Sequence, residues 1–279
     1  MKKVLFCIVL LFFASFVYQE LVSEYKNYPK IKFERINNYK IYYGPPTRTL
    51  LDKMKKYDMV IIEPSYYSKS DIKTLKEQGT LVFGYLSTME INNWNTRIIK
   101  QTIPGDYFYK NGKKVYFPKW DSYLMNISSH HYRKILLGEL KSSIVNKGFD
   151  GVFLDTVGDI DNQQIDKNNH VRQQKGMALF CESIKNQYPY LLTIQNSGFP
   201  TLKDYTIPYI NGVMWESFSV PTVSTDAWSL KQIKILNQLQ KDFSLVVLTV
   251  SSENEFQSSS FAKKNHFINL YSNRNYSKW

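Results

Sequence analysis

Residues 148–156 read Gly-Phe-Asp-Gly-Val-Phe-Leu-Asp-Thr, and this stretch decides the fold assignment. Small or apolar side chains fill positions 151–154, which is typical of a strand buried on both faces of a parallel sheet. The run ends at Asp155, so the strand would deliver a carboxylate to the edge of the sheet. Asp is also a favoured N-cap, and this Asp could simply cap a following helix. Spacing alone leaves both interpretations open.

Short apolar runs alternate with helix-like segments on both sides of this stretch, a pattern typical of βαβ units. We expect eight strands, at Lys40–Tyr43, Met59–Glu63, Leu81–Leu86, Tyr123–Ile127, Gly151–Asp155, Leu191–Gln195, Gly212–Trp215 and Leu245–Val250. Helices are expected at Thr47–Lys56, Ser68–Gln78, His130–Lys147, Val171–Gln187, Leu202–Tyr205 and Ser229–Lys241.

Eight such repeats predict an α/β fold closed into a single-domain (β/α)₈ TIM-type barrel over residues 39–279. An open dinucleotide-binding sheet would need a Gly-rich turn after the first strand, and Gly44-Pro45-Pro46 is not one. A ninth run, Phe267–Tyr271, would be the last strand if one of the eight is wrong. The long connection Glu90–Asp121 is expected to shape a substrate cleft.

The N-terminus predicts export. Lys2 and Lys3 precede an apolar run, Val4–Val17, typical of a secretory signal. The run is short for a membrane span, and no small-x-small cleavage site follows it, so residues 1–17 are either a cleaved signal peptide or a retained signal anchor. Residues 18–38 form a polar lead-in. The protein would then be secreted or extracytoplasmic, touching a membrane only through such an anchor.

Composition excludes several classes of function. The chain carries a net charge of +12, but its lysines are scattered and no nucleic-acid-binding module accompanies them. It has only four histidines, and His130-His131 lacks the helical spacing of a zinc site. It also lacks the Gly-x-Ser-x-Gly motif of serine hydrolases. Cys7 lies in the signal, which leaves Cys181 as one buried thiol. No metal or cofactor is therefore expected.

Two predicted strands end in acids, Asp155 and Glu216, and in a barrel both would reach the same mouth. Two carboxylates without metal ligands indicate general acid/base and nucleophilic chemistry of the glycosidase kind. Trp215 precedes Glu216, and a neighbouring ring can desolvate a carboxyl and raise its pKa. Further acids follow the strands, and their ordinary explanation is solvated loop charge, although an acidic rim would favour a substrate bearing amino groups: Asp159, Asp161, Asp166, Glu253 and Glu255.

The order of motifs resembles glycoside hydrolase family 114, the endo-α-1,4-polygalactosaminidase group related to hydrolase domains that act on biofilm polysaccharides. The resemblance covers about Lys40 to Val250. It rests on Tyr43-Gly44, Glu63-Pro64, Gly84-Tyr85-Leu86-Ser87 with Glu90 and Trp94, residues 149–156, and the strand ending in Glu216. It implies a (β/α)₈ barrel, catalytic acids at Asp155 and Glu216, and a polymer of α-1,4-linked, partly N-acetylated galactosamine. The family typically has an acid and an aromatic residue where this sequence has Ser251 and Ser252. The segment Val157-Gly158-Asp159, after Asp155, is a second departure from the family pattern.

We therefore expect Asp155 to be the nucleophile and Glu216 the general acid/base of a retaining hydrolase. A carboxyl separation of about 5–5.5 Å would support retention, and about 6.5–9.5 Å inversion. A non-catalytic carbohydrate-binding barrel and a transglycosylase remain as alternatives. Candidate sugar contacts are Tyr43, Glu63, Tyr85, Glu90, Trp94, Trp120, Asn196 and Trp215.

Overall fold

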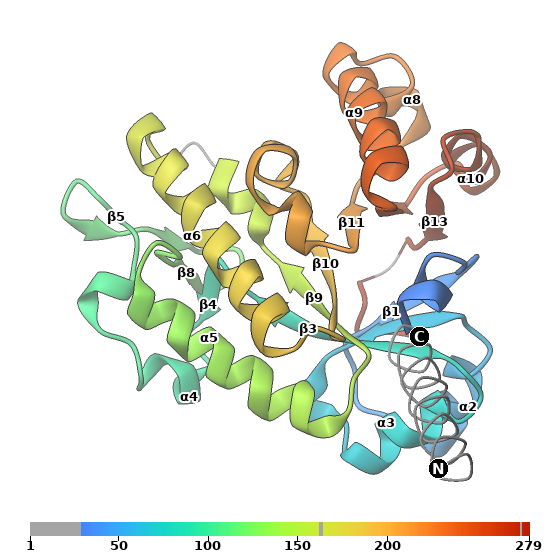
Figure 1. The fold of residues 1–279 in the computed structure, drawn as a ribbon, viewed down its shortest axis with the longest axis horizontal. Coiled ribbons are helices and arrows are strands. Elements are labelled where there is room, and N and C mark those ends of the chain that lie inside the picture. Colours follow the sequence, from blue (N-terminus) through green and yellow to red (C-terminus); the bar gives the residue numbers. More distant parts are fainter. Residues whose placement is uncertain (1–28, 162–163, 274) are drawn as a thin grey trace, which may run out of the picture.

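The computed structural model describes residues 29–161, 164–273 and 275–279. The proposed signal and most of the lead-in lie outside this part of the chain. Eight parallel strands form a nearly closed barrel with helices around it (Figure 1). In sheet order the strands are β1 (Tyr39–Tyr42), β2 (Met59–Ile62), β3 (Leu81–Ser87), β9 (Gly151–Asp155), β10 (Leu192–Asn196), β11 (Gly212–Trp215), β12 (Val246–Ser251) and β13 (Ile268–Tyr271).

Seven of the eight predicted strands are barrel strands, and the segment Tyr123–Ile127 is not. Its first residues belong to β8 (Ser122–Leu124), which pairs antiparallel with β4 (Glu90–Asn92) and β7 (Tyr116–Phe117) in a small separate sheet. β3 pairs directly with β9 instead, and β13 takes the eighth place. The prediction failed because a short apolar run looks the same whether it packs in a barrel or in a satellite sheet.

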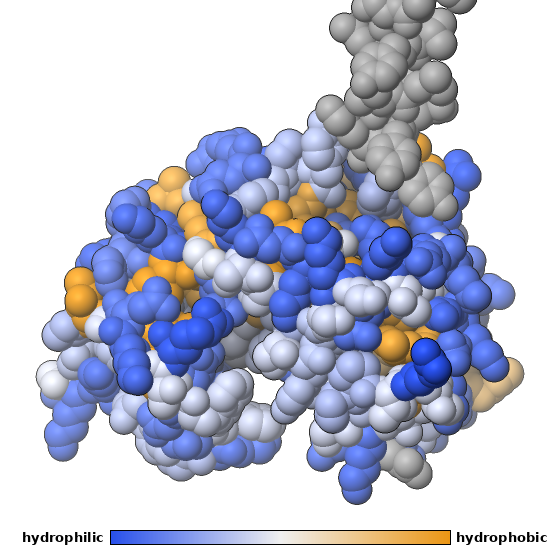
Figure 2. All heavy atoms as spheres, turned by 90° about the horizontal axis from the view of Figure 1, so that it is seen from below, coloured by the Kyte–Doolittle hydropathy of each residue, from blue (hydrophilic) through white to orange (hydrophobic). Residues whose placement is uncertain are grey.

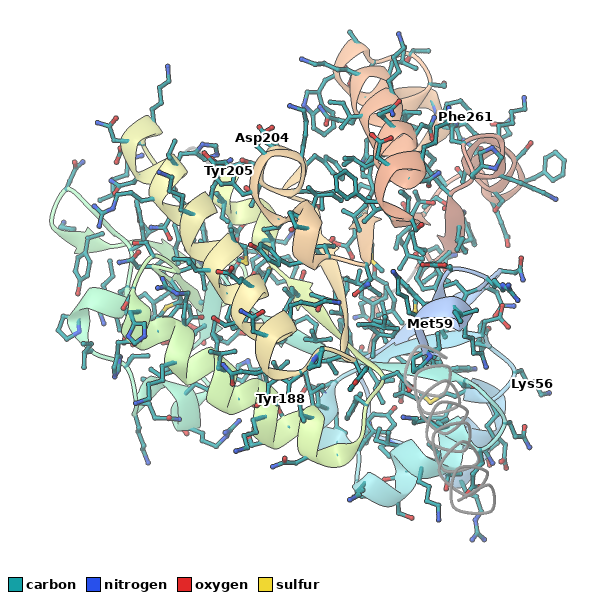
Figure 3. All side chains as sticks on the ribbon, in the orientation of Figure 1. Lys56, Met59, Tyr188, Asp204, Tyr205 and Phe261 are labelled. Carbon is teal, nitrogen blue, oxygen red and sulfur yellow. The ribbon has the colours of Figure 1, made fainter. Side chains whose placement is uncertain are left out.

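Nine α-helices are described, and most follow the predicted segments. The longest, α6, begins four residues before the predicted start, because Asp166 caps it by accepting hydrogen bonds from Asn168 N and Asn169 N. The segment near Leu202 forms a π-helical turn, Leu202–Thr206, which carries Asp204 and Tyr205 (Figure 3). The helices are α2 (Arg48–Met54), α3 (Lys69–Lys76), α4 (Thr96–Ile99), α5 (His130–Ser143), α6 (Lys167–Gln187), α7 (Phe199–Thr201), α8 (Val220–Val223), α9 (Ala227–Phe243) and α10 (Glu255–Lys264).

The long connection between β3 and β9 contains α4, α5 and several short strands. It includes β4, β7 and β8 together with the hairpin of β5 (Tyr109–Lys110) and β6 (Lys113–Lys114). In Figure 1 this region lies on the opposite side of the barrel from α8, α9 and α10.

Alternation along the strands divides the core into two layers. One cluster fills the barrel with alternate strand residues such as Phe83, Phe153 and Met214, and the other packs the outer strand faces against the helices. Gly151 makes the inner layer possible. A Cβ on Gly151 would lie 2.2 Å from the Phe83 ring, which belongs to the residue paired with it on β3.

The outer surface is mostly polar, and the face in Figure 2 shows apolar side chains only in scattered patches. Within the described residues, no helix combines the length and hydropathy needed to cross a membrane. Cys181 is buried on α6 as expected, and burial raises the pKa of its thiol to about 12.

Candidate active site

Three neighbouring strands bring the candidate site residues to one point of the barrel mouth. Phe153, Ile194 and Met214 all point into the barrel, so the side chains two positions further on also point inward. Those side chains are Asp155 at the end of β9, Asn196 at the end of β10 and Glu216 directly after β11.

The three strands also end in the same way. The residue after each site residue has a left-handed backbone: φ is +64° at Thr156, +56° at Ser197 and +57° at Ser217. Such a conformation costs a residue with a side chain about 1–2 kcal/mol. Strain of this kind gathers at functional sites, where the surrounding structure maintains it. An Asp, Asn or Glu followed by Ser or Thr is thus a sequence signal shared by all three strand ends.

Asn196 connects the two acids. Its Nδ2 donates to Asp155 Oδ1 at 2.6 Å and to Glu216 Oε2 at 3.4 Å. An amide nitrogen carries two hydrogens, so one side chain can serve both carboxylates. The two oxygens cannot be farther apart than these two distances laid end to end, about 6 Å. The carboxylate of Asp155 therefore faces across the mouth toward Glu216.

The pKa of Glu216 is raised above its ordinary value. Burial is the largest cause and the nearby charge of Asp155 adds to it, whereas hydrogen bonds from Tyr276 and Asn196 oppose it. Burial disfavours the charged form of a carboxyl, so this environment favours a proton on Glu216. That is the state that a proton donor needs at the start of a reaction.

The source of that burial differs from our expectation. Trp215 is only 6% exposed, but it belongs to the outer core layer, where its ring packs against Phe199, Phe218 and Trp228. Strand alternation sends Trp215 away from the barrel interior and Glu216 into it. The proposed desolvation of Glu216 by the neighbouring ring was therefore wrong, and Trp215, a candidate sugar contact, packs in the outer core layer and not at the barrel mouth.

Two tyrosines, Tyr43 and Tyr85, lie close to Asp155. The Tyr85 hydroxyl hydrogen-bonds with Asp155, and the Tyr43 ring packs edge-on against Tyr85 with 4.9 Å between ring centroids. Burial, with the charge of Asp155 second, raises the pKa of both phenols. Both hydroxyls thus stay protonated and can donate hydrogen bonds. Glu63 lies nearby and accepts a hydrogen bond from Ser65 N at 3.0 Å.

Sequence reasoning missed Tyr276. Its hydroxyl donates to Glu216 Oε1 at 2.8 Å, from a chain position 60 residues away. No motif surrounds it, and Ser272-Asn273 before it and Ser277-Lys278 after it are ordinary polar residues. Only the course of the chain beyond β13 brings it to the site.

A second pair of carboxyls, Glu90 and Asp159, lies beside the first. Burial, followed by a hydrogen bond with Glu90, the charge of Glu90 and the charge of Asp155, raises the pKa of Asp159 to about 8. Ser122 donates to Glu90 from β8, so the small satellite sheet holds one member of this pair. Of the acids expected near Asp155, Asp159 thus lies beside it, and Glu90, expected as a sugar contact, pairs with Asp159.

Three of the other predicted acids have ordinary local partners. Asp161 pairs with His170 at 2.7 Å, Asp166 caps α6, and Glu253 accepts from Ser219 Oγ at 3.2 Å. Trp94 and Trp120 lie on the long connection and are 71% and 59% exposed. His131 binds the buried Asp106 at 2.7 Å. No group of three or more potential metal ligands occurs within the described ranges.

Comparison with known proteins agrees with this geometry. The profile of Glycoside-hydrolase family GH114 matches residues 26–250. A search of curated protein sequences finds no match.

Three similar solved structures are compared with this chain. The glycoside hydrolase domain of PelA from Pseudomonas aeruginosa superposes with a TM-score of 0.71 at 17% identity, covering 87% of this chain and 96% of that one. Ega3 from Aspergillus fumigatus, solved in complex with galactosamine, gives a TM-score of 0.63 at 17% identity, covering 87% and 93%. An α-galactosidase from Thermus thermophilus is more distant, with a TM-score of 0.58 at 10% identity and coverage of 85% and 58%. The family match extends over most of the sequence and includes both carboxylates, so this chain belongs to glycoside hydrolase family GH114 and is a glycosidase.

Proposed function

We propose that the protein cleaves an α-1,4-linked polymer of galactosamine and N-acetylgalactosamine within the chain, with retention of configuration. Asp155 acts as the nucleophile and Glu216 as the general acid/base. The observation that carries this proposal is the single Asn196 amide shared by both carboxylates, which keeps their nearest oxygens within about 6 Å. That separation suits a retaining enzyme, with about 5–5.5 Å between carboxyls, better than an inverting one, with about 6.5–9.5 Å.

The reaction needs two steps. In the first, an oxygen of Asp155 attacks the anomeric carbon, the bond to the leaving sugar breaks, and the leaving oxygen takes the proton of Glu216. In the second, the Glu216 carboxylate removes a proton from water, the water oxygen attacks the anomeric carbon, and Asp155 is released.

The division of roles follows from the surroundings of the two acids. Burial raises the pKa of Glu216, which favours the protonated form that a donor requires. Asp155 accepts hydrogen bonds from Asn196 and Tyr85, which fix the direction of its carboxylate as a nucleophile requires.

The second carboxyl pair, Glu90 and Asp159, favours a substrate with amino groups. Glu90 and Asp159 lie close together beside Asp155, and a sugar ammonium group between them would supply the positive charge that this arrangement lacks. An amino sugar fits this requirement better than a neutral hexose. The galactosamine named in the Ega3 structure is consistent with that choice. The exposed faces of Trp94 and Trp120 would stack on sugar rings beyond the cleavage point.

Product analysis tests the proposal. The protein is incubated with galactosamine polymers of differing acetylation, with neutral galactans as controls, and the products are identified by mass spectrometry and their anomeric configuration by NMR. Hydrolysis to oligosaccharides whose new reducing ends first appear in the substrate's configuration is the expected result. Binding without cleavage would select a non-catalytic barrel, and longer products would select a transglycosylase.

Two substitutions test the assigned roles. Asp155→Asn and Glu216→Gln should each reduce kcat/KM by at least about 10³-fold while leaving thermal unfolding nearly unchanged. Matched controls are Asp52→Asn on α2 and Glu77→Gln after α3, both exposed. Turnover at the wild-type rate in either site variant would reject the assignment.

Export by residues 1–17 is part of the proposal, and it rests on the two lysines and the apolar run. Mass spectrometry of the N-terminus after expression in a secreting host distinguishes a cleaved signal from a retained anchor. An intact N-terminus on protein that stays in the cytoplasm would overturn export.

A further inference from the structure

In the part of the chain that the structure describes, neighbouring barrel strands are joined by backbone pairing except at one place, between β13 and β1, called here the β13–β1 seam. The ladder of paired strands runs from β1 to β13, and within the described residues these two end strands share no ladder. The chain beyond β13 crosses this gap. The backbone N of Tyr43, just after β1, donates to the carbonyl of Tyr276 at 2.7 Å.

The last residues of the crossing segment are held by aromatic packing. Trp279 packs edge-on against Tyr42 and Tyr57, with centroid distances of 5.7 and 5.8 Å. Lys40 Nζ lies 5.8 Å from the centroid of the same ring. The Tyr276 ring also packs on Tyr43 at 5.5 Å. The described residues after β13, 272–273 and 275–279, are called here the C-terminal strap, and they are fixed to β1 and its surroundings at two points.

The strap brings one functional group to the site, the Tyr276 hydroxyl. It donates to Glu216 Oε1 at 2.8 Å, while Asn196 approaches the other oxygen, Oε2, at 3.4 Å. Each oxygen of Glu216 therefore has its own donor, one from the neighbouring strand and one from the strap. The family match ends at residue 250, so the strap lies outside the part of the chain on which membership rests.

We propose that Tyr276 is a positioning residue, carried by the C-terminal strap across the β13–β1 seam, that fixes the Glu216 carboxyl in the orientation needed for proton transfer. The inference rests on the proposed role of Glu216 as general acid/base. Catalysis then depends on a residue that follows the last barrel strand, β13.

The groups that face Glu216 set the expected direction of the pH effect. Asp155 faces it from β9, Tyr39 and Tyr43 from β1 and its end, and Tyr276 from the strap. The Tyr276 hydrogen bond lowers the pKa of Glu216, against burial and Asp155, which raise it. Removing the hydroxyl should therefore raise that pKa. Since a general acid must be protonated, the alkaline limb of the activity profile should move to higher pH.

Tyr276→Phe tests the inference, because it removes the hydroxyl and keeps the ring that packs on Tyr43. We expect kcat to fall about tenfold with KM within about twofold, and the alkaline limb of kcat/KM to rise by about half a pH unit or more. Tyr209→Phe is the matched control, because it removes a hydroxyl that bonds Glu182 at 3.3 Å on the outside of the barrel. It should leave kcat and the profile unchanged.

A second variant separates the strap from the hydroxyl. Trp279→Ala keeps Tyr276 but removes its distal anchor, and it should produce a smaller change of the same kind. If Tyr276→Phe matches wild type in both kcat and pH profile, the inference is overturned. A fall in kcat with an unshifted profile would also overturn it, because it would indicate a structural role.

A readout without substrate keeps the inference independent of the proposed function. The carboxyl of Glu216 is followed by ¹³C NMR during a pH titration, with Glu216→Gln used to assign the signal. A higher pKa in Tyr276→Phe than in wild type supports the contact even if no polymer tested is cleaved. An inactive wild type would count against the proposed function, whereas an active wild type with equal pKa values in both proteins would count against the inference alone.

Discussion

The rim formed by β9, β10 and β11 and the seam between β13 and β1 both provide donors to Glu216, but they are built differently. The rim consists of strand ends, where an apolar run places its last polar residue at the mouth. The seam depends on a strap that follows the last strand and is fixed by Tyr43 and Trp279. The reactive groups therefore come from the local pattern of the strands, whereas the orientation of Glu216 depends on how the chain closes the barrel.

The strongest test of the rim is Asn196→Ala. Asn196 serves both carboxylates, so its loss should lower kcat/KM about 100-fold, or about 2.7 kcal/mol of transition-state stabilisation. This loss should exceed that of Tyr276→Phe, since Tyr276 contacts Glu216 alone of the two acids. Steady-state kinetics of the two variants, measured side by side, decide the order. A larger effect at Tyr276 would make the seam, and not the rim, the main organiser of the site.

The second carboxyl pair, Glu90 and Asp159, is expected to affect the pH dependence of the free energy of unfolding. The pKa of Asp159 is about 8 in the folded protein against 3.8 for an ordinary Asp. Its contribution to stability is therefore fully present below about pH 4 and is lost as the pH rises through about 8. Asp159→Asn removes this titration, so its free energy of unfolding should rise relative to that of wild type by roughly 3–4 kcal/mol from pH 5 to pH 8, at about 1.4 kcal/mol for each pH unit between the two pKa values. Urea unfolding at both pH values measures the difference.

Glu90→Gln is the companion of that experiment. Glu90 is the second cause of the raised pKa, after burial, so this variant should also reduce the pH dependence of unfolding, though not abolish it. A gain of the same size at pH 5 and pH 8 in Asp159→Asn would show that the pair does not titrate as described.

The smallest effect is expected at Trp215. Its ring packs with Phe199, Phe218 and Trp228 outside the barrel, so Trp215→Phe should cost about 1 kcal/mol of stability and leave the pH profile of activity unchanged. Thermal unfolding and kcat/KM against pH are the two measurements. A shift of the alkaline limb as large as that of Tyr276→Phe would restore our first interpretation, in which the ring desolvates Glu216.

Much of the barrel was predictable because buried parallel strands leave a strong local pattern. Seven barrel strands were identified from their apolar runs, and Phe267–Tyr271 was recognised as a candidate for the eighth. The wrong strand, Tyr123–Ile127, lies in the long connection. Its apolar residues pack in a satellite sheet that also positions Glu90 through Ser122. Nothing in a five-residue run distinguishes these two surroundings.

By itself, the sequence determined the barrel, the delivery of Asp155 and Glu216 to its mouth, and the family. Each of these follows from periodicity along a strand or from a contiguous motif. Only the tertiary structure decided that Asn196 joins the two acids, that Trp215 faces outward, that Asp159 pairs with Glu90, and that Tyr276 reaches Glu216. The physical reason is that strand alternation is a local property, whereas a hydrogen bond between residues 60 positions apart exists only once the whole chain has closed around the site.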